Sequence, residues 1–453
     1  MRPRSSLALL LLGAWLLSCV GVSRSPDAPP NVILIFVDTL RADHLGLFGY
    51  PRDTSPALDR FAAESLVFRN TTAQAPWTTP SIASALTSRY PWELGYANSR
   101  PPAVLSDEFL TLPEIFAANG YRTGAVISHL LIGTKLGFGQ GFERFDVANA
   151  QGHQHISSPS IVERAQRFLN SFHDVPFFLF LHFFDPHYAY MLHEPYDYDP
   201  DYAGRLDAGV DQPELLKRIR SLSDEDMQYI RALYDSEIRF TDEHLGLLLE
   251  DLRKRGLYEN SLIIVAADHG EEFREREALH IGHSSTLYQE LIHIPMLIKL
   301  PGSTEGRVVD APVGLIDLAP SIVETLALQV PDGHRFDGRA LPLREPDQFS
   351  QLPEAPIFSE TRVRGKYLQS VTLGRWKLIV DHRAKRKSLY DLESDPGERN
   401  DLAASSPEIV ESYTELLAEW TEDVWQKREG LQLRPAELDR DEIEKLRALG
   451  YMN

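Results

Sequence analysis

Four stretches of this chain are apolar along nearly their whole length, and this feature constrains the fold most. They cover residues 31–37, 177–184, 262–267 and 295–300. Apolar side chains at both odd and even positions indicate strands buried on both faces, the type found in parallel sheets that helices cover. Residues 224–255 carry a helical amphipathic pattern that ends at Gly256. Strands that alternate with helices predict an α/β fold, with a large, mostly parallel sheet and helices on both faces.

The pattern changes after about residue 330, where short stretches alternate between apolar and polar positions. Residues 370–380 show the alternation most clearly, and Gly374 within them marks a hairpin turn. This pattern predicts a smaller C-terminal α+β subdomain with an antiparallel sheet. We therefore expect four segments: a signal peptide (1–18), a tether (19–30), a large domain (31–335) and the C-terminal subdomain (336–453).

The first 30 residues predict export. Arg2 and Arg4 precede an apolar run that is about half as long as a membrane-spanning helix, as in a secretory signal peptide. Cys19, the only cysteine of the chain, ends this run and resembles the lipidated cysteine of a bacterial lipoprotein. The alternative is that Cys19 is an ordinary small residue of the signal peptide. We expect a lipoprotein anchored to a membrane in the bacterial periplasm or outer membrane, with residues 21–30 as the tether.

The length, composition and net charge of the chain limit the classes of function that it can have. The chain has 453 residues, of which 43% are hydrophobic, enough for one large core and an appended subdomain. Its formal net charge is -20, and we find no block rich in lysine and arginine. Because surfaces that bind nucleic acid are normally basic, we expect no nucleic-acid partner.

Polar side chains follow three of the predicted strands. They are Asp38, the pair Asp185 and His187, and the pair Asp268 and His269. The carboxyl ends of strands in an open α/β sheet converge on one crevice, where two carboxylates and an imidazole suit a divalent cation. Taken singly, an aspartate after a strand is more often a helix cap, but the joint placement favours a metal site.

A second feature is the sequence Thr78-Thr79-Pro80, which can cap a helix whose first position is Pro80. A hydroxyl at such a helix start faces free backbone N–H groups, where an anion binds well. A threonine hydroxyl is a poor nucleophile at neutral pH, and a metal held by Asp38 and Asp268-His269 could activate it. The alternative is a simple helix cap without chemistry.

At these residues the chain resembles the sulfatase family of the alkaline phosphatase superfamily. Five motifs match in the correct order between residue 31 and the C-terminus: the opening strand with the first metal aspartate, the substrate-site histidine motif, the second metal motif, a segment with a further polar substrate contact, and the C-terminal hallmark. They lie at residues 31–38, 180–187, 267–270, 283–301 and 389–398. The resemblance implies a catalytic domain at 31–335, and a metal site of Asp38, Thr78, Asp268 and His269.

The chain also departs from this family. Sulfatases carry Cys or Ser followed by x-Pro-x-Arg and convert the first residue to formylglycine. Here Thr78 stands in the first position and Ile82 replaces the arginine, so no formylglycine can form. Thr39 replaces a second aspartate, and the lysine-tryptophan-histidine segment is missing, although His129 could take the place of its histidine.

Superfamily members with an unmodified threonine include phosphodiesterases, phosphonate monoester hydrolases and transferases of phosphoglycerol or phosphoethanolamine. The resemblance therefore implies that Thr78 attacks phosphorus and forms a covalent phosphothreonine, which water or an acceptor alcohol removes. His187 or His283 would protonate the leaving oxygen. Asp185, His129 and Thr79 would contact an anionic ester substrate, such as a lipid headgroup or a glycan.

We expect one metal ion. Enzymes of the superfamily with two zinc ions have an aspartate and a histidine four residues apart, and here Ala189 stands four residues after Asp185. Carboxylate ligands with a single imidazole suit Mn²⁺, Ca²⁺ or Mg²⁺ better than Zn²⁺.

Three functions remain open from the sequence. The first is a threonine-dependent hydrolase or transferase of phosphate or phosphonate esters. The second is a sulfate ester hydrolase that works without formylglycine, and the third is a pseudoenzyme that binds an anionic ligand without turnover.

Overall fold

The computed structural model describes residues 29–96, 103–150, 156–172, 175–187, 189–210, 212–276, 280–363, 365–432 and 434–448. The predicted signal peptide, Cys19 and most of the tether lie outside these residues, so export and lipidation stay predictions. Among the helices of the described part, none is both long and apolar enough to cross a membrane.

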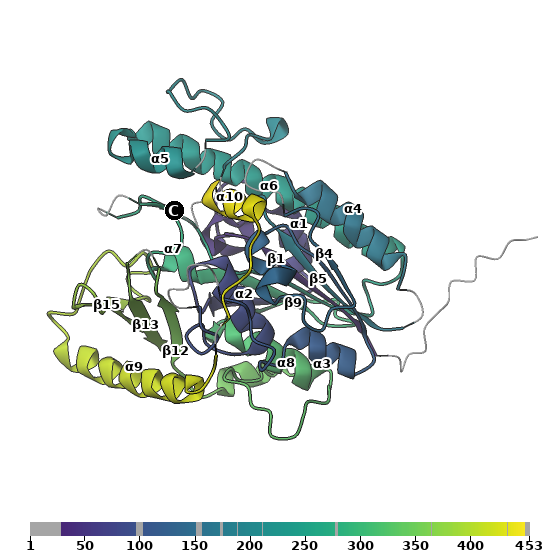
Figure 1. Ribbon diagram of the computed structural model, residues 1–453. Coiled ribbons are helices and arrows are strands. Elements are labelled where there is room, and N and C mark those ends of the chain that lie inside the picture. The colour runs from purple at the N-terminus through teal and green to yellow at the C-terminus, as the bar shows by residue number, and fades with distance from the viewer. Residues whose placement is uncertain are drawn as a thin grey trace, which may run out of the picture.

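One large sheet organises the fold (Figure 1). Its strands lie in the order β10-β2-β9-β6-β1-β5-β3-β4, and β11 pairs with β2. β1 lies between β5 and β6 and is parallel to both. Every residue of these three strands is buried, as their apolar sequences predicted. The strands are β1 (Asn31–Val37), β2 (Leu66–Thr72), β3 (Arg122–Val126), β4 (Arg144–Asp146), β5 (Phe177–Phe183), β6 (Ser261–Ala267), β9 (His293–Lys299), β10 (Arg307–Val309) and β11 (Val313–Gly314).

β9 is the exception to the parallel arrangement, because it runs antiparallel to both β2 and β6. Its described connection from β6 consists of β7 (Glu272–Phe273), β8 (Ile281–Gly282) and the short helix α7 (Gln289–Ile292). A parallel return usually runs through a crossover helix, whereas α7 in the described part of this connection has only 4 residues. The apolar run at residues 295–300 correctly indicated a buried strand, but burial on both faces does not report strand direction.

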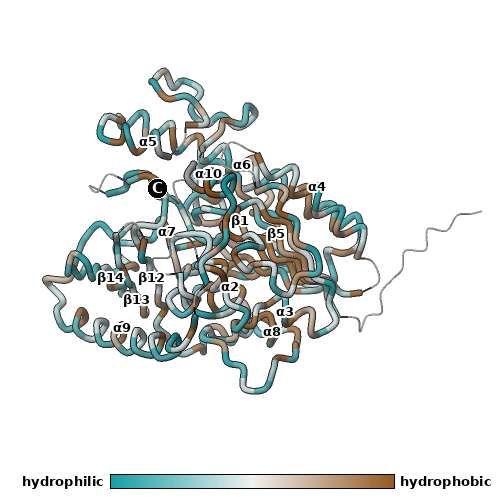
Figure 2. Tube along the Cα trace, viewed as in Figure 1, coloured by the Kyte–Doolittle hydropathy of each residue, from teal (hydrophilic) through white to brown (hydrophobic). Residues whose placement is uncertain are grey.

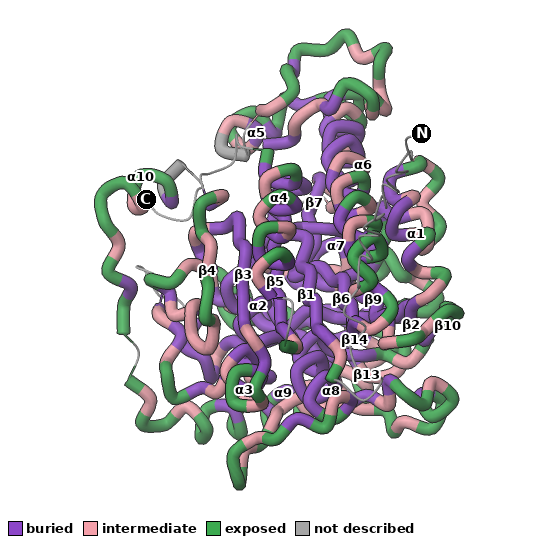
Figure 3. The backbone as a smooth tube through the Cα atoms, turned by 90° about the vertical axis from the view of Figure 1, so that its right-hand side faces the viewer, coloured by how far each residue is buried: buried purple, intermediate pink, exposed green. Residues whose placement is uncertain are grey.

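Helices cover both faces of the sheet, as the sequence predicted (Figures 1 and 3). One group contains α1 (Pro56–Ala62), α4 (Ser158–Leu169) and α6 (Asp224–Lys254), and α6 contacts both of the others. The other group contains α2 (Thr78–Thr87), α3 (Leu112–Ala118) and α8 (Leu318–Thr325), and α2 contacts both of its partners. The remaining helices of more than one turn are α5 (Gln212–Arg218), α9 (Pro407–Arg428) and α10 (Arg440–Ala448). Figure 2 shows the apolar residues gathered in the strands between the two groups.

A separate four-stranded antiparallel sheet forms the C-terminal part, which confirms the predicted α+β subdomain. Its strands are β12 (Ile357–Thr361), β13 (Leu368–Leu373), β14 (Trp376–Asp381) and β15 (Arg386–Asp391), in that order. Gly374, with φ +56°, lies in the turn between β13 and β14. Helix α9 packs on this sheet through Leu417 and Trp420. The exact domain boundary at 335/336 stays a prediction.

The predicted C-terminal hallmark at 389–398 is a structural joint. Lys377 Nζ on β14 lies 2.8 Å from Glu398 Oε1, and both side chains are fully buried. Glu398 also accepts the backbone N–H of Gln289 at 2.7 Å and contacts Arg276. These charges therefore connect the C-terminal sheet to the segment between β6 and β9.

Candidate active site

The carboxyl ends of β1 and β6 meet, and each delivers one aspartate. Asp38 follows β1, and its backbone N–H donates to Phe183 O at 2.9 Å. Asp268 follows β6, and its Oδ1 accepts the N–H groups of Thr39 at 3.3 Å and His269 at 2.9 Å. His269 Nε2 lies 3.6 Å from Asp38 and 3.4 Å from Asp268. The structure thus brings together side chains that are about 230 residues apart in the sequence.

Thr78 lies at the same place. Its Oγ1 is 3.3 Å from His269 Nε2, and it is fully buried. Helix α2 begins at Thr78 itself, after the extended residue Trp77, so Pro80 is the third helical residue and not the first. The predicted side-chain cap is therefore wrong, since neither threonine caps the helix. The hydroxyl of Thr78 nevertheless stands in the first turn, where backbone N–H groups are free to bind an anion.

The other residues of the first turn tie α2 to its surroundings. Ser81 Oγ donates to Asp268 O at 2.6 Å, which joins the helix to the end of β6. Thr79 Oγ1 donates to Leu131 O at 3.0 Å. The structure therefore places the predicted substrate contact Thr79 against a backbone carbonyl, because the second helical residue points away from the two aspartates.

Three of the four carboxylate oxygens at this site lack a hydrogen-bond donor among the described residues. Asp38 Oδ1, Asp38 Oδ2 and Asp268 Oδ2 are buried and have no hydrogen-bond partner among the described residues. Burial, and then the charges of Asp268 and Glu271, raise the pKa of Asp38 well above its ordinary value. Burial also raises the pKa of Asp268. Since buried charge is costly without a partner, a divalent cation fits this donor set.

His182 completes the set and was missed from the sequence. It lies on β5 beside Phe36, and its Nε2 is 3.5 Å from Asp38 Oδ2. Possible ligand atoms of Asp38, His182 and Asp268 all lie within 4.8 Å of one another. Burial lowers the pKa of His182 to about 3, so the imidazole is neutral and able to bind a metal. The available signal was that His182 is the only polar residue among residues 177–184.

Three further histidines surround the same site. The ring centroids of His187 and His283 are 4.9 Å apart, and those of His269 and His283 are 4.6 Å apart. The ring of His129 lies 5.8 Å from that of His187, and its Nδ1 accepts the N–H of Leu131. Asp38, His129 and His187 form a second group with possible ligand atoms within 4.8 Å. The predicted residues His129, His187 and His283 therefore do meet beside Thr78.

The β7–β8 hairpin carries two carboxylate–imidazole pairs. Glu271 Oε1 lies 3.0 Å from His283 Nδ1, and Glu272 Oε2 lies 3.0 Å from His280 Nδ1. Neighbouring residues of a strand point to opposite faces. The first pair therefore faces the histidines of the site, while the second faces Ser285, whose Oγ lies 3.0 Å from His280 Nε2.

Asp185 has a different place from the one predicted. Its two carboxylate oxygens accept the N–H groups of Ser157 at 2.5 Å and Ser158 at 2.7 Å, at the start of α4. Both oxygens are thus used to hold a helix N-terminus. The structure places Asp185 in a helix cap instead of a substrate contact, the usual role of an aspartate in that position.

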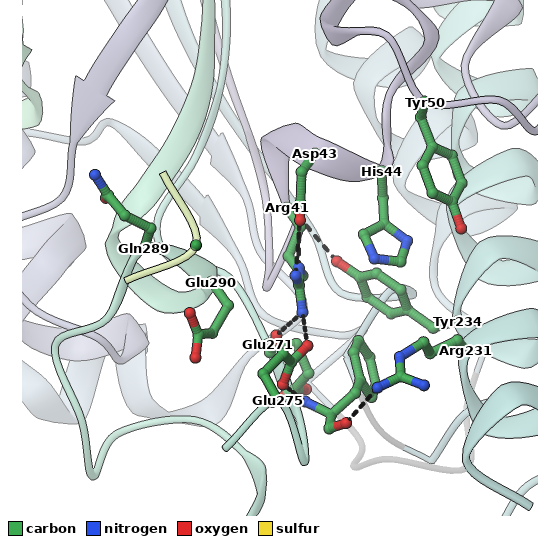
Figure 4. Close-up of polar contacts among 12 residues, drawn as sticks. Arg41, Asp43, His44, Tyr50, Arg231, Tyr234, Glu271, Glu275, Gln289 and Glu290 are labelled. Atoms are coloured by element: carbon green, nitrogen blue, oxygen red, sulfur yellow. Dashed lines mark hydrogen bonds and ion pairs between the residues drawn. The ribbon is translucent and has the colours of Figure 1, made fainter. Parts of the chain in front are cut away.

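The loop after β1 is anchored from two sides (Figure 4). Tyr234 on α6 donates its hydroxyl to Thr39 O at 2.6 Å and accepts the N–H of Arg41 at 3.0 Å. Arg41 also donates to Glu271 O at 2.9 Å and pairs with Glu275. Thr39 has φ +55°, a strained conformation for a β-branched residue that such contacts can maintain. They fix Asp38 relative to the end of β6.

A family model described as Sulfatase matches residues 30–328, about two thirds of the chain, and this range contains Asp38, His182, Asp268 and His269. The chain belongs to the sulfatase family. A second model, for the C-terminal region of N-sulphoglucosamine sulphohydrolase, matches residues 283–429. This sulfatase-family chain is 28% identical over 372 residues to the Ulvan-active sulfatase of Formosa agariphila, which covers 75% of this chain and 70% of that protein.

Solved structures share the fold of this sulfatase-family hydrolase. One is a protein in complex with its substrate D-glucosamine-2-N,6-O-disulfate, with a TM-score of 0.69, 19% identity and coverage of 91% of this chain and 100% of that one. Another is the phosphonate monoester hydrolase of Agrobacterium radiobacter, with a TM-score of 0.66, 21% identity and coverage of 91% and 98%. These likenesses confirm the predicted alkaline phosphatase/sulfatase-like fold.

Proposed function

We propose that this hydrolase cleaves anionic esters with Thr78 as its nucleophile, beside one divalent cation held by Asp38, Thr78, Asp268 and His269. The observation that carries the proposal is the place of Thr78 Oγ1, which is 3.3 Å from His269 Nε2 at the first residue of α2. A hydroxyl in that position can reach an anion bound at the helix N-terminus. A purely structural threonine would not need three carboxylate oxygens without hydrogen-bond donors beside it.

A cation at this site would stabilise charge on the transferring group and lower the pKa of the Thr78 hydroxyl. The carboxylates of Asp38 and Asp268 favour a hard ion such as Mn²⁺, Ca²⁺ or Mg²⁺. His182 adds a nitrogen donor that the sequence argument did not include. Measuring the metal content of the purified protein tests both the identity and the number of ions.

Residues of the chain carry out the nucleophilic attack, the proton transfer to the leaving oxygen and the stabilisation of charge. Thr78 Oγ1 releases its proton to solvent and forms a bond to phosphorus or sulfur, while the ester bond to the leaving oxygen breaks. That oxygen takes a proton from His187 or from His283, which Glu271 holds in place. Free N–H groups of the first turn of α2 face the negative charge of the transferring group. Water then hydrolyses the threonine ester, or an acceptor alcohol takes up the group.

Phosphate or phosphonate esters are our first choice of substrate, because Thr78 cannot become formylglycine and Ile82 cannot contact a sulfate as arginine would. Hydrolysis of sulfate esters is the second candidate. It is supported by the name of the Ulvan-active sulfatase and by the disulfated substrate of the solved relative.

The test is to assay Thr78→Ala with bis(4-nitrophenyl) phosphate, 4-nitrophenyl phenylphosphonate and 4-nitrophenyl sulfate. We expect kcat/KM to fall by about 10⁴-fold on whichever ester the wild type cleaves, because the variant lacks the proposed nucleophile. Thr87→Ala is the matched control: it removes a buried hydroxyl from the other end of α2, where Oγ1 only donates to Ala83 O.

Two outcomes oppose the proposal. Wild-type activity in Thr78→Ala would show that Thr78 is not the nucleophile. No turnover of any of the three esters by a protein that retains its metal would favour the pseudoenzyme that binds an anion without cleaving it.

A further inference from the structure

A serine, a histidine and a glutamate form a hydrogen-bonded row on the face of the β7–β8 hairpin that points away from the Thr78 site. Ser285 Oγ lies 3.0 Å from His280 Nε2, and His280 Nδ1 lies 3.0 Å from Glu272 Oε2. Glu272 belongs to β7, His280 comes directly before β8, and Ser285 follows β8. In this arrangement an imidazole can take the proton of a serine hydroxyl while a carboxylate orients the ring.

The carboxylate of Glu272 sets the direction of both hydrogen bonds. An ionised carboxylate only accepts, so the bond to Glu272 places the ring proton of His280 on Nδ1. Nε2 then carries the free electron pair and accepts the hydroxyl of Ser285. Thr286 Oγ1 donates to the same oxygen of Glu272 at 3.3 Å, which holds the carboxylate from a second side. The hydroxyl of Ser285 therefore points at a base that is itself held in place.

The row is shielded from water at one end and reachable at the other. Glu272 is 1% exposed and Ser285 is 8% exposed, whereas the side chain of His280 is 18% exposed. Burial strengthens the hydrogen bond between the carboxylate and the imidazole. The exposed edge of the His280 ring leaves the approach by which a small ligand can reach Ser285.

The backbone around Ser285 has two features that suit a nucleophile. Thr286 is the next residue, and its N–H donates to no acceptor among the residues that the structure describes. The N–H that follows a nucleophilic serine is a common donor to the oxyanion of an acyl-transfer intermediate. Ser284, the preceding residue, has φ +83°, a conformation that is costly for a residue with a side chain and that is found often at active sites.

We propose that Ser285, His280 and Glu272 form a second catalytic site, which hydrolyses small uncharged acyl esters. Ser285 Oγ attacks the carbonyl carbon, its proton passes to His280 Nε2, and the N–H of Thr286 faces the oxyanion. The bond from this carbon to the leaving oxygen then breaks, and the leaving alcohol takes the proton from His280. Water attacks the acyl-serine and gives a proton to His280, which returns it to Ser285 as the carboxylic acid departs.

Charge and space select this class of substrate. Glu272 is held against the imidazole in a chain whose formal net charge is -20, which disfavours an anionic ester. The low exposure of Ser285 admits a short acyl group, and an acetyl ester meets both conditions. The proposed class therefore differs from the anionic esters assigned to Thr78.

The experiment uses full-length Thr78→Ala protein with a chelator, so that neither the proposed nucleophile nor the metal of the first site takes part. Diisopropyl fluorophosphate should label Ser285, whose Oγ bonds to phosphorus as fluoride leaves, and mass spectrometry of tryptic peptides locates the label. The same protein should hydrolyse 4-nitrophenyl acetate. Ser285→Ala and His280→Asn should each lower kcat/KM at least about 100-fold, and Glu272→Gln about 10-fold.

Two matched controls test whether these losses are specific. Ser284→Ala removes a buried hydroxyl from the preceding residue, and Glu237→Gln changes a buried carboxylate that lies 2.9 Å from His193 Nε2. Each should change kcat/KM for 4-nitrophenyl acetate by less than about twofold. Thermal unfolding of each variant at the wild-type temperature shows that a loss of hydrolysis is not a loss of fold.

A folded Thr78→Ala protein without label on Ser285 would overturn the inference, and this measurement needs no change at the second site. Equal hydrolysis of 4-nitrophenyl acetate by Ser285→Ala and Ser284→Ala would overturn it as well. Because Thr78 is absent from every sample, failure of Thr78 as the nucleophile for anionic esters would leave both results interpretable.

Discussion

Two of the clusters of buried charge in the described part of the chain differ in one respect. At the joint between the two sheets, Lys377 and Glu398 are fully buried and lie 2.8 Å apart. At the end of β1 and β6, Asp38 and Asp268 are equally buried, yet three of their four oxygens have no donor among the described residues. Both clusters fall in motifs that resemble sulfatase hallmarks. The first cluster contains a lysine that balances the carboxylate, whereas the two aspartates of the second have only histidines as possible ion-pair partners among the described residues.

The comparison shows that burial of charge does not by itself mark a functional site. A buried ion pair offsets part of its own desolvation cost and holds elements together. A buried carboxylate without a partner is unstable unless something outside the chain supplies the charge. The C-terminal hallmark therefore holds elements together, whereas the aspartate motifs form a group of ligand atoms that could hold a metal ion.

Breaking the paired cluster should have the largest effect on stability. Lys377→Met leaves Glu398 buried without its ammonium partner, and we expect the free energy of unfolding to fall by about 3–5 kcal/mol. Urea unfolding measures this change. Lys135→Met is the control, since Lys135 is 46% exposed and its ion pairs should contribute less than about 1 kcal/mol. A loss in Lys377→Met no larger than in the control would show that the joint is not stabilised by this pair.

Binding of a divalent cation at Asp38 and Asp268 should change the stability of the protein less than breaking the Lys377–Glu398 pair does. A divalent cation at one hundred times its Kd should stabilise the protein by about 2.7 kcal/mol, and a chelator should remove this gain. Asp38→Asn should respond to neither the metal nor the chelator, because it lacks one of the ligands. Asp310→Asn, at an exposed aspartate paired with Arg69, should respond like the wild type. Thermal unfolding with and without metal measures this, and an unchanged response in Asp38→Asn would remove Asp38 from the metal site.

The β7–β8 hairpin allows the sharpest comparison, although the expected effect is the smallest. We expect Glu271 to act as a positioning residue for His283, so Glu271→Ala should lower kcat by about 10–100-fold with KM nearly unchanged. Glu271→Gln still offers Nδ1–H an acceptor and should recover most of the activity. Glu272→Ala is matched in burial and sequence but releases His280, on the opposite face. Equal losses of kcat in the two alanine variants would indicate a structural role for both carboxylates.

Much of the fold could be predicted because its signals are local. Apolar runs such as residues 177–184 predicted the buried strands, and the amphipathic pattern of 224–255 predicted α6 to within one residue. The direction of β9 could not be predicted, because it depends on the path of the connection through β7, β8 and α7 and not on the composition of the strand.

The sequence predicted most residues of the candidate site, and the structure corrected individual ones. Aspartates at strand ends predicted the meeting of Asp38 and Asp268, since parallel strands end at one edge. His182 was missed because a histidine inside an apolar strand carries no sign of its neighbour, which here is Asp38 on the next strand. Asp185 stood in an equally suggestive position, but the start of α4 occupies both of its oxygens.

By itself the sequence determined the buried strands, the order of the family motifs and the absence of a residue that could become formylglycine at position 78. Tertiary structure alone decided that Thr78 is the first residue of α2, that His269 lies 3.3 Å from its hydroxyl, and that Glu271 rather than Glu272 faces the site through His283. The physical reason is that burial follows from local composition, whereas partnership between polar groups depends on which segments the chain brings within hydrogen-bond distance.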